Sequence, residues 1–254
     1  MTMSSIAKTS LGSKTTKSSS DQKPKSADIT SGPGFQVCAN IERPSKKLID
    51  RFKKFETADV SDLLNRMYTM DHAITNQTNR TSLVGPAVTV KVFPGDNLML
   101  HKALDLAEPG DVVVVDTSGS QRNAVFGDLI ANKALHRGIA GFVIDGLIRD
   151  IDGVCETGLP VYARGITSFG PLHRGPGELN FPVSCGGIVV NPGDVIAADT
   201  SGVVVIPKNF SATAAMRLTT HQARMEEYVR NVKRGIFSND WVDQQLQNDG
   251  CLFE

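Results

Sequence analysis

The chain has 254 residues, with 27 Lys and Arg balanced by 27 Asp and Glu, so its formal net charge is zero. A chain of this length can bury a sizeable core, as one large domain or two small ones. The charge balance argues against a long basic surface, and therefore against nucleic acid as the main partner. No apolar run approaches the roughly 18 residues that a membrane span needs, so no membrane partner is expected.

The cysteine content is low and carries no metal-binding pattern. The four cysteines are widely spaced and include no CxxC pair: Cys38, Cys155, Cys185 and Cys251. Free thiols in a reducing compartment are the simplest interpretation, and they predict a cytoplasmic protein.

Residues 1–34 are rich in Ser, Thr and Lys and end in Gly32-Pro33-Gly34, a composition that predicts a disordered tail. The first twenty residues contain lysines but no acidic residue, which leaves organellar targeting open. They lack the arginines and the amphipathic stripe of a transit peptide. The remainder, residues 35–254, is expected to form a single domain that ends in a helix.

The first half of this domain alternates predicted helices and strands. Helices are expected at Lys46–Phe55, at Ser61–Met67 with Ser61 as the N-cap, and from Gly95-Asp96 to Ala107. Strands are expected at Val84–Phe93 and Val112–Val115. The polar loop Thr117–Ala124 follows the second strand and is expected to line a site, because loops at strand ends often do. His101, on the third helix, could face that site or serve only the structure.

The segment from Phe126 to Asp150 organises the rest of the chain. It predicts a helix over Ala131–Arg137 that turns Leu129, Ile130, Ala134 and Leu135 inward, then a stop at Gly138 and a buried strand at Ala140–Ile144. A helix running one way and a strand running back would bring Asp128 and the Arg149-Asp150 pair to one sheet edge. In α/β folds, ligands usually bind beyond the carboxyl ends of the strands.

The last third of the chain has a different, hairpin-like pattern. Strands are expected at Val161–Ala163, Val183–Val190, Val195–Ala198 and Val203–Ile206, with a long loop over Gly165–Phe181 and a final helix from Ser211 to about Arg234. Combined with the strand–helix–strand middle, this predicts an α/β fold with a mixed or two-sheet core.

Three charges at one sheet edge suggest a specific chemistry. Two carboxylates can hold a hard divalent cation, and an arginine can grip a substrate carboxylate. The free N–H groups at the helix start, around Leu129 and Ile130, would offer a second anion site. The simpler alternative is a helix-dipole partner at Asp128 and a surface ion pair at Arg149-Asp150. Gly127 and Gly146 could be ordinary turn residues or could let the backbone approach a ligand.

The spacing of Asp128, twenty intervening residues and Arg149-Asp150 resembles the signature of the class II pyruvate aldolases. These enzymes cleave 4-hydroxy-4-methyl-2-oxoglutarate and 4-carboxy-4-hydroxy-2-oxoadipate, and they are similar in sequence to the regulator of ribonuclease activity A. The resemblance runs from about Asp59 to Pro207. It includes DVSDLL at 59–64, DNLMLHKAL at 96–104, PGDVVVVD at 109–116 and PVSCGGIVVNPGDVIAADTSGVVVIP at 182–207.

The resemblance implies a three-layer β/β/α swivelling-domain fold and an assembly into homotrimers or hexamers. It implies that Asp150 binds Mg²⁺ or Mn²⁺ directly, that Asp128 holds the ion through ordered water, and that a water on the cation acts as the base. Arg149 would contact the pyruvate oxygens. The backbone at Gly127, Leu129 and Ile130 would hold the pyruvate carboxylate.

Two features of the family are uncertain in this chain. Members draw an acid from a neighbouring subunit's C-terminal region, for which Glu226 and Glu227 are the candidates. Many also carry an acid three residues after the second Asp of the motif, where this chain has Gly153. Asp152 lies one place earlier, and this departure concerns the substrate rather than the metal site.

The expected function is therefore a divalent-metal-dependent lyase. It would release pyruvate from a 4-hydroxy-2-oxo di- or tricarboxylic acid, with oxaloacetate decarboxylation as a side reaction. The alternatives are a non-catalytic regulator that binds proteins and a related lyase for another 2-oxo acid. In the family that this chain resembles, the regulators lack the first aspartate of the motif, whereas this chain has Asp128 at that position. A methyltransferase ranks last, because no glycine-rich strand-to-helix turn is evident.

Overall fold

The computed structural model describes residues 28–252, so most of the predicted disordered tail lies outside the described residues. The strands are β1 Phe35–Val37, β2 Thr75–Asn76, β3 Leu83–Val92, β4 Val112–Asp116, β5 Ala124–Phe126, β6 Gly141–Ile148, β7 Val161–Ile166, β8 Gly177–Leu179, β9 Val183–Cys185, β10 Ile188–Val190, β11 Val195–Asp199 and β12 Gly202–Ile206. The helices are α1 Lys46–Phe52, α2 Thr57–Leu63, α3 Leu98–Leu106, α4 Asp128–His136, α5 Ile151–Glu156, α6 Ser211–Lys233 and α7 Asp240–Asn248.

The long strand β3 joins two sheets. Its first residues, Leu83–Pro86, pair antiparallel with β11, and the residues that follow, Ala87–Lys91, pair parallel with β4. The larger sheet has the order β1-β8-β3-β4-β6-β7-β2, and β5 also pairs with β6. Its centre is parallel, as the strand–helix–strand pattern predicts, whereas β11 and β12 form an antiparallel hairpin.

Three buried clusters hold these layers together. The first lies between the larger sheet and α3, α4 and α5. The second lies between the opposite face of that sheet and strands β9 to β12. The third joins the outer face of β11 and β12 to α1, α2 and α6. Alternate residues of β11 enter different clusters, Ile196 the second and Val195 and Ala197 the third, as the two-residue period of a strand requires.

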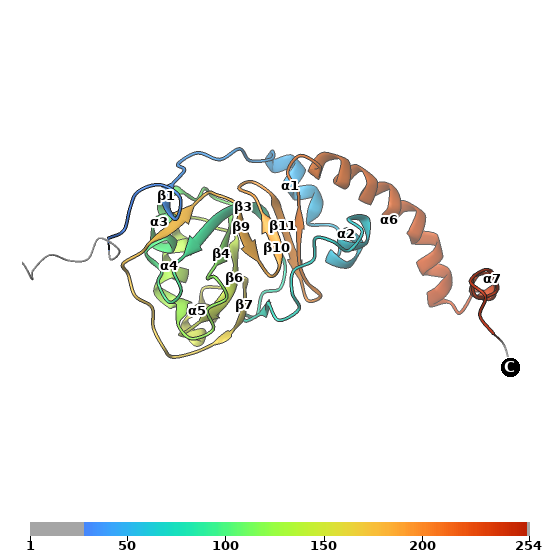
Figure 1. The fold of residues 1–254 in the computed structure, drawn as a ribbon. Helices are drawn as coiled ribbons and strands as arrows, with labels where there is room; N and C mark the ends of the chain where they lie inside the picture. The colour runs from blue at the N-terminus through green and yellow to red at the C-terminus, as the bar shows by residue number, and fades with distance from the viewer. Residues whose placement is uncertain (1–27, 253–254) are drawn as a thin grey trace, which may run out of the picture. The chain divides into compact units, whose positions relative to one another are not determined.

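The predicted α/β class and the β/β/α layering are confirmed. The structure adds a further helical layer, because α1, α2 and α6 cover the side of the second sheet that faces away from α3, α4 and α5 (Figure 1). Only the first turns of α6 take part: its buried residues are Ser211, Ala214, Ala215 and Leu218. Within residues 28–252, no helix combines the length and apolarity needed to cross a bilayer.

The second predicted helix begins earlier than expected, and Ser61 is not its N-cap. The helix α2 starts at Thr57, and Ser61 lies near its C-terminus, where its hydroxyl is 2.6 Å from that of Thr69. The start is stabilised by a distant residue: the carboxylate of Asp199 accepts hydrogen bonds from the Thr57 amide at 2.8 Å and hydroxyl at 2.6 Å. Because this contact spans 142 positions, local sequence rules could not reveal it.

Several other predicted boundaries are also corrected. Ile151–Glu156 is the helix α5 rather than a turn, and β8 lies inside the predicted loop Gly165–Phe181. Val183–Val190 is two strands, because Gly186 and Gly187 turn with positive φ values of 56° and 79°. Leu129 and Leu135 are exposed rather than inward, since α4 packs on the sheet through Ile130, Ala131 and Ala134.

The aromatic pair Phe126 and Phe142 provides a test of the first cluster. Both rings are buried, and their centroids lie 4.5 Å apart. We expect Phe142→Ala to lower the free energy of unfolding by about 3–5 kcal/mol in urea denaturation, because it removes a large side chain from a packed core. Val189→Ala, at an exposed position, should change it by less than about 0.5 kcal/mol. Equal stabilities of the two variants would contradict this packing.

Candidate active site

A pocket of about 250 Å³ lies where β5 and β6 end. Its lining includes both halves of the motif and the residues beside Asp128: Gly127, Asp128, Leu129, Ile130, Arg149 and Asp150. The expectation that the two halves of the motif meet at one sheet edge is thus confirmed. Their roles remain predictions.

Parallel pairing of β5 with β6 brings the two halves together. The register shifts between Ala124 and Phe126, and the amide of Arg149 then donates to the Phe126 carbonyl at 2.9 Å. The next residues along each chain segment, Gly127-Asp128 and Asp150, are therefore held beside each other. The helix α4 starts immediately after Gly127, and α5 starts immediately after Asp150.

Asp150 has an unusual backbone and an uncommitted side chain. Its φ of 54° and ψ of 44° are left-handed, a conformation that is uncommon for residues other than Gly, although Asp adopts it more readily than most, and that clusters at functional sites. An Asp before a helix usually caps the first turn, yet Asp150 makes no such hydrogen bond. Its Oδ2 lies instead 3.1 Å from Nε of Arg149, beside the pocket. The carboxylate is therefore free of any capping bond and lines the pocket.

Two glycines leave room for the carboxylates. A Cβ at Gly127 would lie 2.7 Å from Oδ2 of Asp150 and 3.2 Å from Cγ of Arg149. A Cβ at Gly153, on α5, would lie 2.9 Å from Cβ of Asp128. The absence of an acid at position 153 thus has a physical basis, since any side chain there would press on Asp128. Asp152 points elsewhere: it is exposed and does not line the pocket.

The prediction of free amides at the start of α4 is wrong for the structure as it stands. The amide of Leu129 donates to Oδ1 of Asp128 at 2.7 Å, and the amide of Ile130 donates to the Gly127 carbonyl at 3.1 Å. A bound carboxylate would have to displace Asp128 from the Leu129 amide.

The donor set at this end suits a hard divalent cation. Asp128 and Asp150 supply oxygen ligands only, the preference of Mg²⁺ and Mn²⁺. The described residues contain no group of three or more His, Cys, Asp or Glu side chains placed to bind a metal. Two carboxylates fit an ion that keeps several waters or takes a further acid from another chain. Glu226 and Glu227 lie on the exposed part of α6 and do not line this pocket.

The other end of the pocket is built from α3 and the loop before β8. Asn97 is 2% exposed, and its side chain donates from Nδ2 to the Val125 carbonyl at 3.0 Å. Its Oδ1 lies 2.6 Å from Nδ1 of His173, and the His173 ring stands edge-on to that of His101 with centroids 5.6 Å apart. Burial lowers the pKa of His101, and Lys133 and His173 lower it further, while Asp96 opposes them.

Two loops near the pocket behave differently. No residue of the loop Thr117–Ala124 lines the pocket, so the prediction that this loop lines the site is wrong. The segment Gly165–Phe181 does contribute, through Pro171 and His173. It is pinned along its length: the Ala124 amide donates to the Phe169 carbonyl at 2.8 Å, and Nδ2 of Asn123 donates to the Gly170 carbonyl at 2.7 Å.

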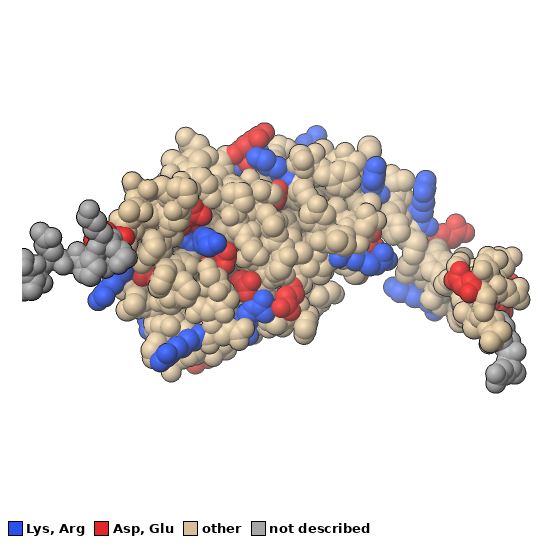
Figure 2. All heavy atoms as spheres, viewed as in Figure 1, with Lys and Arg blue, Asp and Glu red and all other residues tan. Residues whose placement is uncertain are grey.

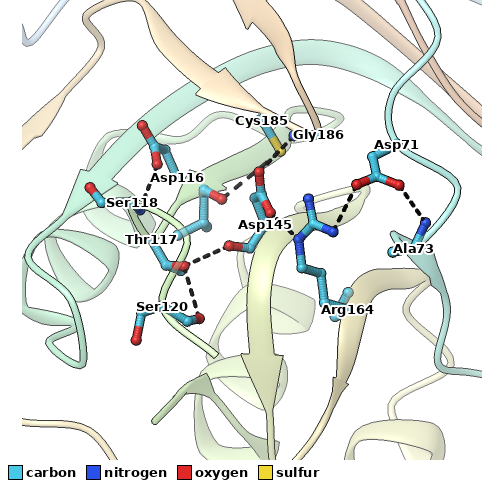
Figure 3. A network of polar contacts seen from close by, with 12 residues as sticks. Asp71, Ala73, Asp116, Thr117, Ser118, Ser120, Asp145, Arg164, Cys185 and Gly186 are labelled. Atoms are coloured by element: carbon cyan, nitrogen blue, oxygen red, sulfur yellow. Dashed lines mark hydrogen bonds and ion pairs between the residues drawn. The ribbon is translucent and has the colours of Figure 1, made fainter. Parts of the chain in front are cut away.

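A second polar network connects the middle of β6 with neighbouring segments (Figure 3). The Asp145 carboxylate accepts from Nε of Arg164 and from the Gly186 amide, and Arg164 reaches Asp71 at 3.0 Å. The Thr117 hydroxyl donates to the Asp145 carbonyl at 2.6 Å. Every charged group of this network has a partner, so we interpret the network as structural. Burial raises the pKa of the nearby Cys185 thiol well above its ordinary value, as do Asp145 and Asp116, which argues against a cysteine nucleophile.

A larger groove, of about 1000 Å³, lies elsewhere and is lined by Asn65, Tyr68, Asn180 and Arg217 among others. It contains none of the residues that the sequence predicted for the site. Large hollows are the usual first candidates for binding sites. The smaller pocket is the better candidate here, because a strained aspartate, a second carboxylate and an arginine converge on it.

Comparison with known proteins identifies the family of the chain. A family model described as RraA-like, Aldolase/RraA, matches residues 57–205. The chain belongs to the RraA-like family. A relative from Halalkalibacterium halodurans, provisionally named as a 4-hydroxy-4-methyl-2-oxoglutarate aldolase, is 37% identical over 190 residues, which cover 75% of this chain and 90% of the relative. A relative of the same name from Ectopseudomonas mendocina is 40% identical over 136 residues, covering 54% and 83%.

The solved structures point to the same fold. Streptomyces coelicolor RraAS2, titled an unusual member of the RNase ES inhibitor RraA protein family, superposes with a TM-score of 0.68 at 28% identity. The match covers 75% of this RraA-like chain and 99% of the other. The family thus includes proteins named as aldolases and proteins named as inhibitors of RNA processing, so membership does not decide between the two functions.

Gly127 provides a test of the pocket geometry. Its φ of −158° is open to any residue, so Gly127→Ala should keep the melting temperature of the parent. The added methyl group would displace the Asp150 carboxylate and Arg149. We therefore expect Mn²⁺ affinity, followed by electron paramagnetic resonance, to fall about tenfold or more, the scale of effect seen when the support of a metal ligand is lost. Unchanged affinity in the folded variant would contradict the assignment of Asp150 as a ligand.

Proposed function

We propose that this RraA-like protein is a divalent-cation-dependent lyase. It cleaves a 4-hydroxy-2-oxo di- or tricarboxylic acid to pyruvate and a second 2-oxo acid, and it decarboxylates oxaloacetate as a side activity. The observation that carries the proposal is Asp150, held in a left-handed conformation with its carboxylate free of any capping bond. This arrangement leaves the carboxylate available to a cation, and such backbone conformations are common at functional sites.

The chain's own residues have separate tasks in this reaction. Arg149 lies beside Asp150 and would bind the 2-oxo acid through its guanidinium, stabilising the negative charge that builds up as the C–C bond breaks. Asp128 and Asp150 would hold Mg²⁺ or Mn²⁺. When bound, such an ion acts as a Lewis acid on the 2-oxo group and makes its coordinated water more acidic.

The start of α4 would bind the carboxylate of the pyruvate half. Once Asp128 turns towards the pocket, the Leu129 amide is released and can donate to that carboxylate. The helix N-terminus adds its partial positive charge, which favours an anion there. Gly127 and Ile130 complete this wall of the pocket.

Exposed apolar side chains around the pocket support an assembly of copies. Leu98, Leu129, Phe169 and Leu172 are all exposed and lie on the pocket wall or within two residues of it. An apolar surface of this kind usually marks a contact with another protein. We propose a homotrimer or hexamer in the cytoplasm, in which Glu226 or Glu227 of another subunit could reach the cation. No nucleic acid or membrane partner is proposed, and the face in Figure 2 intersperses acidic and basic residues without a broad basic area.

A regulator that acts by binding proteins is the second candidate, and the similarity to an RNase ES inhibitor favours it. Such a role needs a surface, but it needs neither a strained Asp150 nor a glycine that clears space for its carboxylate. We therefore rank the lyase first.

The deciding experiment is pyruvate release, coupled to NADH oxidation, from 4-hydroxy-4-methyl-2-oxoglutarate and from oxaloacetate. We expect pyruvate from both with Mg²⁺ or Mn²⁺ and none with excess EDTA. A folded sample that releases no pyruvate from either compound would count against the lyase, and a search for protein partners would follow.

Substitutions of the motif should separate its roles. We expect Asp150→Ala to abolish turnover and Mn²⁺ binding together, because it removes the cation ligand. Arg149→Ala should lower kcat by about 10²–10³, the usual loss when a group that stabilises developing charge is removed, yet leave Mn²⁺ bound. The control is Asp152→Ala, an exposed acid in the first turn of α5, which should retain parental kinetics. Full metal-dependent activity in Asp150→Ala would disprove the site assignment.

A further inference from the structure

The pocket contains a positive charge that the proposed roles of Asp128, Arg149 and Asp150 leave unused. Lys133 lies on α4 and lines the pocket together with all three. Its ammonium forms no ion pair with any residue between 28 and 252. An unpaired cation on the wall of a pocket for anionic substrates is a candidate for binding one of their carboxylates.

Helix geometry places Lys133 one turn beyond the amide that would hold the pyruvate carboxylate. Leu129 and Lys133 are four positions apart, so their side chains share a face of α4, and their Cα atoms lie about 6 Å apart along the helix axis. Side chains on a helix lean towards its N-terminus, which directs Lys133 back towards Leu129. Both residues line the pocket, as this direction requires. Lys133 and the Leu129 amide therefore lie along one wall.

The proposed substrates carry carboxylates at a matching distance. In 4-hydroxy-4-methyl-2-oxoglutarate, a chain of five carbons has a carboxylate at each end. Its four C–C bonds, of about 1.5 Å each, separate the two end carbons by roughly 5 Å when the chain is extended. With C1 held at the Leu129 amide, C5 reaches the part of the wall that Lys133 lines.

The charges of the pocket leave one partner for that second carboxylate. A divalent cation would offset Asp128 and Asp150, and Arg149 would offset the pyruvate carboxylate. Of the Lys and Arg side chains in the described lining, Lys133 is the one that remains. Burial lowers the pKa of His101, and the charge of Lys133 lowers it further, so that ring is the weaker partner for an anion at neutral pH.

We propose that Lys133 binds the distal carboxylate of the substrate and makes the enzyme selective for 4-hydroxy-2-oxo acids that carry a carboxylate on C4. This inference rests on the proposed lyase function and deepens it, because it names the residue that recognises the second half of the substrate. The ammonium donates to the carboxylate that leaves with the second 2-oxo acid, in a charge-assisted hydrogen bond. Lys133 determines specificity and takes no part in breaking the C–C bond.

Two substrates that differ in this carboxylate alone provide the test. 4-Hydroxy-4-methyl-2-oxopentanoate has a methyl group where 4-hydroxy-4-methyl-2-oxoglutarate has its distal carboxylate, and its cleavage releases pyruvate and acetone. We expect the parent protein to prefer the dicarboxylate by about tenfold or more in kcat/KM. Lys133→Gln should lower kcat/KM for the dicarboxylate by about tenfold or more, the scale of a hydrogen bond to a charged group, and change that for the pentanoate by less than about twofold.

Three comparisons separate recognition of charge from a structural effect. Lys133→Arg keeps a positive charge and should retain most of the preference for the dicarboxylate. Inhibition by pyruvate, which lacks the distal group, should change by less than about twofold in Lys133→Gln. The matched control is Lys102→Gln, an exposed lysine of the neighbouring helix α3 that does not line the pocket, and it should match the parent with both substrates.

The inference is overturned if Lys133→Gln lowers kcat/KM for both substrates equally or for neither, or if the parent protein cleaves the two substrates equally well. A parent protein that releases no pyruvate from either compound or from oxaloacetate is a different result, because it refutes the lyase function itself.

Discussion

The candidate site depends on one close approach between two chain segments. The hydrogen bond from the Arg149 amide to the Phe126 carbonyl, at 2.9 Å, closes the end of the β5–β6 pairing and sets the residues that follow side by side. At that spacing, a Cβ at Gly127 would lie 2.7 Å from the Asp150 carboxylate. The glycine, the left-handed backbone at Asp150 and the absence of a cap on α5 are therefore consequences of a single constraint. The two chain segments lie close enough here that α4 and α5 both begin at this pocket.

The surrounding structure supplies the stability that this arrangement costs. Strand β6 is buried on both faces, against α4 and α5 on one side and the second sheet on the other. The Asp145–Arg164–Asp71 network fixes the middle of the same strand, at Asp145, through charged hydrogen bonds (Figure 3). Charge-assisted bonds of this kind are stronger than neutral ones when they are partly buried. A strained residue can persist at the end of β6 because burial and hydrogen bonds hold the preceding part of the strand in place.

The sequence predicted those parts of the site that depend on order along the chain. A helix followed by a returning strand brings Asp128 near Arg149-Asp150 by geometry alone, and the structure agrees. The sequence could not predict contacts between segments that lie far apart along the chain. Asp199 starts α2 from 142 positions away, and Asn97 contacts His173 across 76 positions. The inward placement of Leu129 failed for a related reason, because the periodic pattern does not distinguish a core face from an apolar rim around a pocket.

The two ends of the pocket are supported in different ways, and this division bears on specificity. The end with Asp128, Arg149 and Asp150 is built on strands and helix starts, which hold groups in place most firmly. The end with His173 is a loop, although three backbone hydrogen bonds tie it to Gly95–Asn97. In an enzyme of this design the rigid end would process the pyruvate half, which is common to every substrate. The loop would face the half that differs. A change of substrate would then require changes in the loop, at Lys133 or in any neighbouring subunit, while the motif on β5 and β6 stays as it is.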